Sequence, residues 1–148
     1  MYIIGIEPRS PGWNIFSKFK MPRIGLVLLL TIAKLMGHRC KIFCEEIAAI
    51  QWKEIEKANM ILISTITATA TRAYELIEKI REVNPTAPIL IGGPHVTFLP
   101  EEALYKGANY VFRFEADESF SLFLQWWVSG RDLQALLDIS GISFKVGT

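Results

Sequence analysis

The 148-residue sequence lacks several features that would place it in a common functional class. It has no excess of charge, since 16 basic and 15 acidic residues give a net charge of +1, and this argues against a nucleic-acid partner held by bulk charge. The apolar residues 24–33 form too short a run for a membrane-spanning helix, which needs roughly 20 residues. The N-terminus has no basic region before its apolar residues, unlike a signal peptide. We therefore expect a cytoplasmic protein that binds neither nucleic acid nor membrane.

Several nucleotide-binding and catalytic motifs are also missing. There is no GxxxxGK[ST] segment of a P-loop, and no GxGxxG segment follows the first expected strand. A phospho-acceptor receiver domain would need an Asp at the end of the third expected strand, where Ser64 or Thr65 stands. No Cys or Ser has a His-based activation motif. The sequence therefore predicts no catalytic residue and no metal ligand in this chain.

The chain has two cysteines, Cys40 and Cys44. Both lie in or beside an expected strand, where residues four apart are about 13 Å from each other, too far for a disulfide. Their spacing matches the first half of CxxxCxxC, but the third position is Ile47. We expect two reduced cysteines and no iron–sulfur cluster in this chain.

The residues that are present predict one folded domain over residues 1–148, because 51% of them are hydrophobic and the chain is long enough for a sizeable core. Strands are expected at residues 2–6, 39–44, 59–65, 88–91 and 110–114, and helices at 22–36, 52–57, 71–83, 100–105 and 117–128. This alternation predicts an α/β fold with a doubly wound, five-stranded parallel sheet in the order 2-1-3-4-5 and helices on both faces. Residues 130–148 are expected to be a tail or linker, with a further short strand or tail at 141–146.

The most informative segment is residues 89–104, ILIGGPHVTFLPEEAL. A buried strand ends in Gly92 and Gly93, and a new helix begins at Pro100, where two acidic residues suit the positive end of the helix dipole. Ligands of doubly wound sheets bind at this carboxyl edge, and glycines let a ligand approach the main chain. We expect loops 7–22, 64–71, 92–99 and 114–118 to form the site, and Gly93→Leu to abolish binding without unfolding the domain.

Four segments, taken together, resemble the N-terminal cobalamin (B12)-binding domain of B12-dependent radical SAM proteins. They are residues 22–42 (PRIGLVLLLTIAKLMGHRCKI), 63–84 (ISTITATATRAYELIEKIREVN), 92–104 (GGPHVTFLPEEAL) and 107–120 (GANYVFRFEADESF). The resemblance covers nearly the whole chain and lies in the order and spacing of the segments. It implies a flavodoxin-like (Rossmann-like) domain that holds the corrin ring at the carboxyl ends of its strands, with the nucleotide tail between the third- and fourth-strand loops.

The resemblance also implies the residues that contact cobalamin. They are Ser64, Thr65, Thr67, Thr69, Gly92, Gly93, Pro94, His95, Thr97, Glu115 and Glu118. For the hydroxyl residues the alternative is capping of the following helix, and for His95 it is a loop-capping imidazole. The acidic loop that usually reads GEGE in the family reads FEADE here, with Phe114 and Ala116 in place of the glycines. No DxHxxG motif follows the first strand, so we expect base-off cobalamin without a His ligand to cobalt.

The implied function is that of an accessory domain, which does not turn over substrate by itself. It would hold cobalamin over a C-terminal radical SAM barrel of a methyltransferase or related enzyme, with residues 130–148 leading toward that barrel. One alternative is a degenerate B12-like domain that binds no cobalamin and serves in docking or substrate recognition; the lost glycines favour it, whereas the intact GGPH favours cobalamin. A further alternative is a flavodoxin-like FMN protein, whose phosphate loop would use Ser10 and Gly12.

Overall fold

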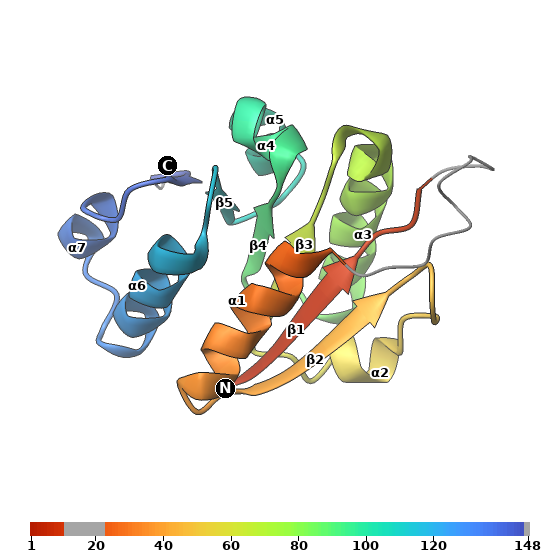
Figure 1. Ribbon diagram of the computed structural model, residues 1–148, viewed down its shortest axis with the longest axis horizontal. Helices are drawn as coiled ribbons and strands as arrows, with labels where there is room; N and C mark the ends of the chain where they lie inside the picture. Colours follow the sequence, from red (N-terminus) through yellow and green to blue (C-terminus); the bar gives the residue numbers. More distant parts are fainter. Residues whose placement is uncertain (11–22, 147–148) are drawn as a thin grey trace.

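The computed structural model describes residues 1–10 and 23–146, which form a six-stranded sheet covered by helices (Figure 1). The strands are β1 (Tyr2–Glu7), β2 (Arg39–Cys44), β3 (Met60–Ser64), β4 (Ile89–Gly92), β5 (Tyr110–Phe112) and β6 (Ile142–Phe144). Their order is β2-β1-β3-β4-β5-β6. Neighbours from β2 to β5 are parallel, and β6 pairs antiparallel with β5.

The predicted flavodoxin-like fold and the strand order 2-1-3-4-5 are confirmed, but the sheet has one strand more than the five predicted. Residues 130–148 were expected to be a tail or linker. They contain helix α7 (Leu133–Leu137) and β6, and Leu136 and Ile139 are buried in the core. Because β6 runs antiparallel to β5, it needs no long crossover helix before it, and the sequence therefore lacks the signal that predicted the parallel strands.

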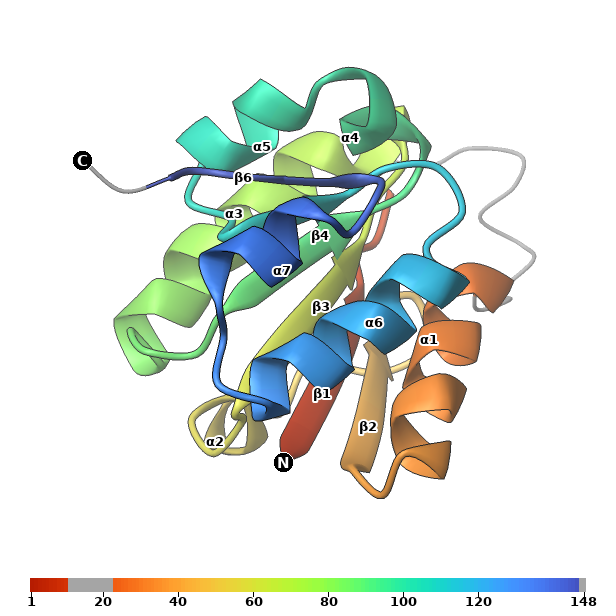
Figure 2. The same ribbon diagram turned by 90° about the vertical axis from the view of Figure 1, so that its left-hand side faces the viewer.

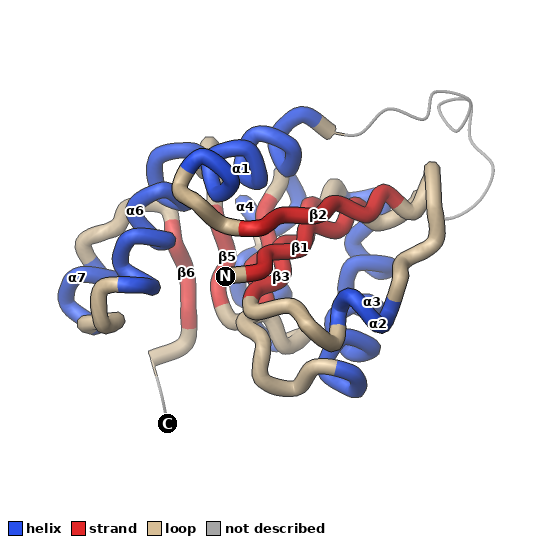
Figure 3. The backbone as a smooth tube through the Cα atoms, turned by 90° about the horizontal axis from the view of Figure 1, so that it is seen from below, coloured by secondary structure: helices blue, strands red, loops and turns tan. Residues whose placement is uncertain are grey.

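The helices cover both faces of the sheet. One face carries α1 (Ile24–Leu35), α6 (Asp117–Val128) and α7 (Figure 2). The other carries α2 (Trp52–Ile55), the 3-10 turn η2 (Thr67–Thr69), α3 (Ala70–Val83), α4 (Pro94–Phe98) and α5 (Pro100–Tyr105). Seen from below, α1 and α6 lie on one side of the strands and α2 and α3 on the other (Figure 3). No helix in residues 1–10 and 23–146 is long and apolar enough to span a bilayer.

The core consists of two layers, one on each side of the sheet. Along β3, Ile61 and Ile63 belong to the α3 layer and Met60 and Leu62 to the α1 layer. Side chains alternate between the faces of a strand, and burial on both faces explains why this strand is a continuous apolar run.

Gly5 in β1 allows α1 to approach the sheet closely. A Cβ at this position would lie 2.7 Å from Leu30 Cδ1 and 3.2 Å from the Leu26 side chain. Since Gly5 is fully inside the sheet and α1 packs directly on it, this contact sets how near the helix lies to the strands beside it.

The loop expected at 92–99 contains a short helix, α4. Pro94 occupies its first turn, where a preset φ and a missing N–H suit a helix start. Leu99, with φ −128 and ψ 55, separates α4 from α5. The structure therefore replaces the expected loop by a helical segment over the edge of the sheet.

Candidate functional site

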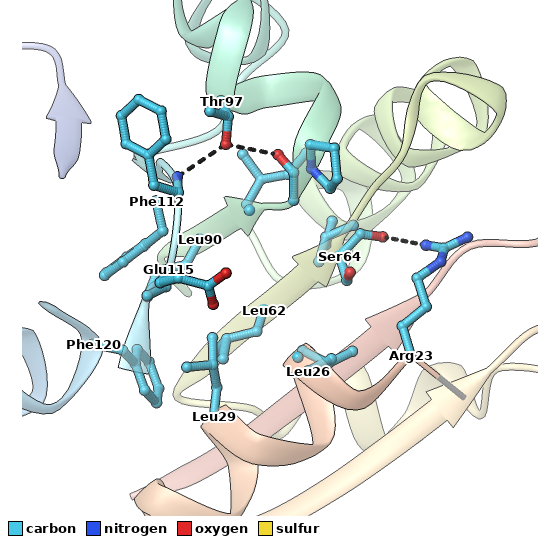
Figure 4. A pocket seen from close by; sticks show the side chains of 18 of the residues that line it. Arg23, Leu26, Leu29, Leu62, Ser64, Leu90, Thr97, Phe112, Glu115 and Phe120 are labelled. Carbon is cyan, nitrogen blue, oxygen red and sulfur yellow. Dashed lines mark hydrogen bonds between the residues drawn. The ribbon is translucent and has the colours of Figure 1, made fainter. Parts of the chain in front are cut away.

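A cavity of about 480 Å³ opens at the carboxyl ends of β3, β4 and β5, between α1 and α6 (Figure 4). This is the sheet edge at which the sequence predicts a ligand. The contributing elements come from both halves of the chain, because α1 precedes and α6 follows the strands that form the floor.

The floor of the cavity is made by β3 and β4. Leu62 pairs with Leu90, and Ser64 pairs with Gly92, two residues nearer the edge of the sheet. Alternation along the strands places these four residues on the face that α1 and α6 cover. A Cβ at Gly92 would make only ordinary contacts, 3.4 Å from the Phe112 carbonyl oxygen and 3.6 Å from Phe112 Cβ. The bare backbone at Gly92 therefore keeps this part of the cavity open.

The walls are apolar. They are formed by Leu26 and Leu29 from α1, Phe112 from β5 and Phe120 from α6. Leu26 and Phe120 are 3% and 0% exposed. Such a lining accommodates a flat apolar group and offers little to a charged one.

Charged groups lie at the rim, where Arg23 joins α1 to the sheet. Its guanidinium Nη1 donates to the Ser64 carbonyl oxygen at 3.3 Å, and its Nε lies 3.7 Å from Glu7 Oε1. The Arg23 backbone N–H donates to Glu7 Oε2 at 2.8 Å. Glu115, just before α6, and Asp117, its first residue, also line the cavity. These contacts fix the start of α1 beside the ends of β1 and β3.

Thr97 and Gly93 hold α4 against the loop that follows β5. The buried Thr97 hydroxyl donates to the Gly93 carbonyl at 3.1 Å and accepts from the Phe114 N–H at 3.0 Å (Figure 4). Gly93 has φ +112, and a Cβ there would overlap the carbonyl oxygen of Thr65. The structure thus contradicts the expectation that Gly93→Leu leaves the fold intact, because packing on Thr65 already requires glycine.

Two of the predicted hydroxyl residues serve the local backbone. Thr65 and Thr69 are both fully buried, and their hydroxyl oxygens are 3.1 Å apart. Thr69 Oγ1 also accepts the Ile66 N–H at 3.1 Å. Neither residue lines the cavity. Their hydroxyls bond within the turn before α3, and Thr69, the N-cap residue of α3, makes no side-chain capping bond to that helix.

His95 lies on the α3 side of α4, away from the cavity. Its Nδ1 is 3.4 Å from Thr67 Oγ1, and its Nε2 is 3.6 Å from Glu102 Oε2. The Tyr74 ring lies 6.3 Å from the His95 ring. Burial, and then the Glu102 charge, raise the pKa of Tyr74 to about 12. Within residues 1–10 and 23–146, Tyr74 Oη and His95 Nε2 have no hydrogen-bond partner.

The two positions that carry glycine in the GEGE pattern differ in the structure. Phe114 has φ +60, in the left-handed region that favours glycine, and its side chain is 67% exposed at the rim of the cavity. Ala116 has φ −111, which any residue adopts. Of these two positions, only Phe114 carries backbone strain.

Six of the eleven predicted site residues line the cavity: Ser64, Gly92, Gly93, Pro94, Thr97 and Glu115. The other five do not: Thr65, Thr67, Thr69, His95 and Glu118. The sequence reasoning missed the apolar lining, chiefly Leu26, Leu29, Leu62, Leu90, Phe112 and Phe120, and the rim residue Arg23. Alternation along β3 and β4 could have indicated the face, but buried leucines there resemble ordinary core.

The described part of the chain holds no cluster of three or more His, Cys, Asp or Glu side chains that could bind a metal ion. Cys40 and Cys44 are free thiols, and burial raises the pKa of each.

Comparisons with known proteins show which family the chain belongs to. Residues 15–124 match the family model of the B12 binding domain. The uncharacterized methyltransferase PH0819 of Pyrococcus horikoshii is 26% identical over 132 residues, which cover 84% of this chain and 28% of that protein. The chain thus spans less than a third of this curated relative.

Two solved structures share the fold. The radical S-adenosylmethionine methyltransferase TsrM of Kitasatospora setae superimposes with a TM-score of 0.70 at 15% identity, over 98% of this chain and 28% of that one. The N-terminal domain of the hypothetical protein TM0182 of Thermotoga maritima gives 0.51 at 21% identity, over 82% and 96%. Because the family model covers most of the sequence, this chain belongs to the B12-binding domain family.

Proposed function

We propose that this chain is the cobalamin-binding accessory part of a B12-dependent radical SAM enzyme, a methyltransferase or a related one. The observation that carries the proposal is the apolar cavity at the carboxyl edge of the sheet, between α1 and α6. Its volume of about 480 Å³ falls in the usual range of small-molecule sites, roughly 300–1,000 Å³. The family match and the two methyltransferases among the similar proteins support it.

The different parts of cobalamin would contact different parts of the lining. The aromatic base of the nucleotide tail would occupy the apolar end, against Leu62, Leu90 and Phe120. The polar sugar and phosphate would lie nearer the rim, within reach of Ser64 and Arg23. Bound cobalamin supplies a cobalt centre that carries a methyl group. This chain binds and orients the cofactor, and the reaction belongs to a C-terminal radical SAM barrel.

We also propose that cobalamin is bound base-off without a histidine ligand from this chain. The chain has two histidines, His38 and His95, and neither lines the cavity. His38 Nδ1 lies 3.4 Å from the N-terminal amine, beyond the amino end of β1 and far from the site. With the tail held in the cavity, its base is separated from cobalt.

A docking module that binds no cobalamin is the second candidate. The observation that favours it is the rim, where Phe114 and Phe98 are 67% and 79% exposed. The FMN alternative has less support: the Ser10 N–H donates to Glu46 Oε1 and the Arg9 N–H to Glu45 Oε2, so carboxylates stand where a phosphate would have to bind. Gly12, the other residue of that hypothesis, lies outside the described residues.

Titration of the purified chain with hydroxocobalamin and methylcobalamin tests the proposal, with visible spectra and calorimetry as readouts. We expect saturable binding and a base-off spectrum. Gly92→Leu should abolish binding and leave the far-UV circular dichroism unchanged, because its added side chain points into the cavity without a backbone clash.

The matched control is Ala68→Leu, an exposed position near the same edge of the sheet that does not line the cavity. It should bind like the parent chain. Unchanged binding by Gly92→Leu would move the site elsewhere. No binding at high micromolar cobalamin by the parent chain would favour the docking module.

A further inference from the structure

The inner end of the cavity has no side chain that forms hydrogen bonds. It is lined by Leu26, Leu29, Leu62, Leu90, Phe112 and Phe120. Five of these six are 3% exposed or less, and Leu29 is half-buried. Figure 4 shows Leu29, Leu62 and Phe120 together, away from Arg23 and Thr97.

The backbone groups beside these side chains are also already hydrogen-bonded. β3 is paired with β1 on one side and β4 on the other, and β4 is paired with β3 and β5. Leu62 and Leu90 lie inside these ladders, so the strand N–H and C=O groups at this depth are already bonded to neighbouring strands. A ligand atom in contact with these six side chains meets carbon only.

Figure 4 draws one polar side chain of the lining, Glu115, beside Leu62 and Leu90, and the others lie further from the leucines. Thr97 is satisfied by Gly93 and Phe114. The Ser64 carbonyl accepts from Arg23. Glu115 is exposed and keeps its contact with water. These groups can bind the sugar and phosphate of a tail, whereas the six apolar side chains offer a base no hydrogen-bond partner.

We propose that this cavity selects among cobamides by the base of the nucleotide tail, accepting benzimidazole or phenol bases and rejecting purines; this inference rests on the proposed function. Adenine carries an exocyclic amine and several ring nitrogens, whereas 5,6-dimethylbenzimidazole has a single free ring nitrogen and p-cresol has none. Each polar group that loses water without gaining a partner weakens binding.

The experiment compares the dissociation constants of four corrinoids with a common corrin ring: cobalamin, p-cresolyl cobamide, adeninyl cobamide and tail-less cobinamide. We expect the adeninyl form to bind at least about tenfold more weakly than cobalamin. The p-cresolyl form should bind at least as tightly as cobalamin, and cobinamide more weakly than either. The cost of detaching the base from cobalt cannot produce this order, because the more basic benzimidazole is the harder of the two nitrogen bases to detach.

A variant pair locates the effect in the wall. Leu29→Gln places an amide at the half-buried wall position and should narrow the ratio of adeninyl to cobalamin dissociation constants several-fold. Val27→Gln introduces the same side chain on the same helix outside the cavity, and should leave the ratio of the two dissociation constants unaltered. Both changes are at exposed or half-buried helix positions, where glutamine is a good helix former.

The outcomes separate this inference from the function on which it rests. Equal affinities for cobalamin, adeninyl cobamide and cobinamide would show that the corrin binds while the tail stays outside, which overturns the inference and leaves cobalamin binding standing. A ratio unmoved by Leu29→Gln would also overturn it. If none of the four binds, the proposed function and the inference fail together.

Discussion

Replacing Gly93 with alanine tests whether the turn after β4 is held by packing. Gly93 has φ +112 and ψ 173, a region that is essentially restricted to glycine. An added Cβ would also overlap the Thr65 carbonyl, which lies in backbone and cannot rotate away. Gly92, its neighbour, has neither problem.

The expected magnitude is the sum of two costs. The unfavourable dihedrals cost about 1–3 kcal/mol, and the backbone shift that relieves the overlap costs a further 1–3 kcal/mol or so. Gly93→Ala should therefore lower the free energy of unfolding by about 3 kcal/mol or more, and Tm by about 6–12 °C for a chain of this size. Gly92→Ala should change the free energy by less than about 1 kcal/mol.

Urea unfolding followed by tryptophan fluorescence measures both variants. Trp126 and Trp127 pack on Tyr110 with ring centroids 6.1 and 6.2 Å away, so their emission reports the loss of the α1-side core. If Gly93→Ala unfolded within 1 kcal/mol or so of the parent chain, or if Gly92→Ala were equally damaging, the packing argument for this turn would be refuted.

Three further predictions concern strain and charge. Phe114→Gly should stabilise the fold by up to about 1 kcal/mol, because glycine adopts φ +60 without strain. Ala116→Gly should destabilise the fold by about 0.5–1 kcal/mol. A change of Tm in the same direction for both variants would contradict this prediction. Burial raises the pKa of Tyr74 from 10.0 to about 12, so its contribution to the free energy of unfolding is fully present below pH 10 and is lost as the pH rises toward 12. Tyr74→Phe should reduce this loss of stability at alkaline pH by about 1–2 kcal/mol, measured by unfolding at a series of pH values. Burial alone would raise the pKa of Glu45, but the guanidinium of Arg72, at 2.8 Å, and the Arg9 N–H lower this pKa below 4.5. The stabilisation from the Glu45–Arg72 pair is therefore present above pH 4.5 and is lost as the pH falls through the lower pKa of the folded state. Arg72→Met should lower the free energy of unfolding by about 1–3 kcal/mol at neutral pH and weaken its dependence on pH below 4.5; an acid dependence equal to that of the parent chain would refute the pairing.

The fold could be predicted where burial leaves a simple pattern. β2 and α6 have the predicted bounds. β2 is an edge strand that is buried only at Phe43 and Cys44, and α6 begins with two acids. β6 was recognised only as a possible short strand, since three residues returning antiparallel show no periodicity. The helix α4 was missed because Gly-Gly-Pro indicates a turn, although Pro94 also starts a helix.

The site divides in the same way. The sequence indicates its edge, because glycines, hydroxyls and acids follow the ends of β3, β4 and β5. It cannot indicate that Leu62 and Leu90 face a cavity, since that depends on the space between α1 and α6. That space is set by tertiary contacts such as those of Gly5 with α1. Nor can spacing alone tell a hydroxyl that bonds to the local backbone, as that of Thr69 does, from one that meets a ligand.

The placement of the cavity between α1 and α6 has a consequence for how the protein matures. The two helices lie side by side but flank the sheet from early and late parts of the chain (Figure 2). A chain that has folded only as far as β4 has a floor and one wall but lacks Phe120 and the far side. Pairings between distant segments form late, because loop closure must come first. A nascent chain therefore has both walls of this cavity only once α6 has docked.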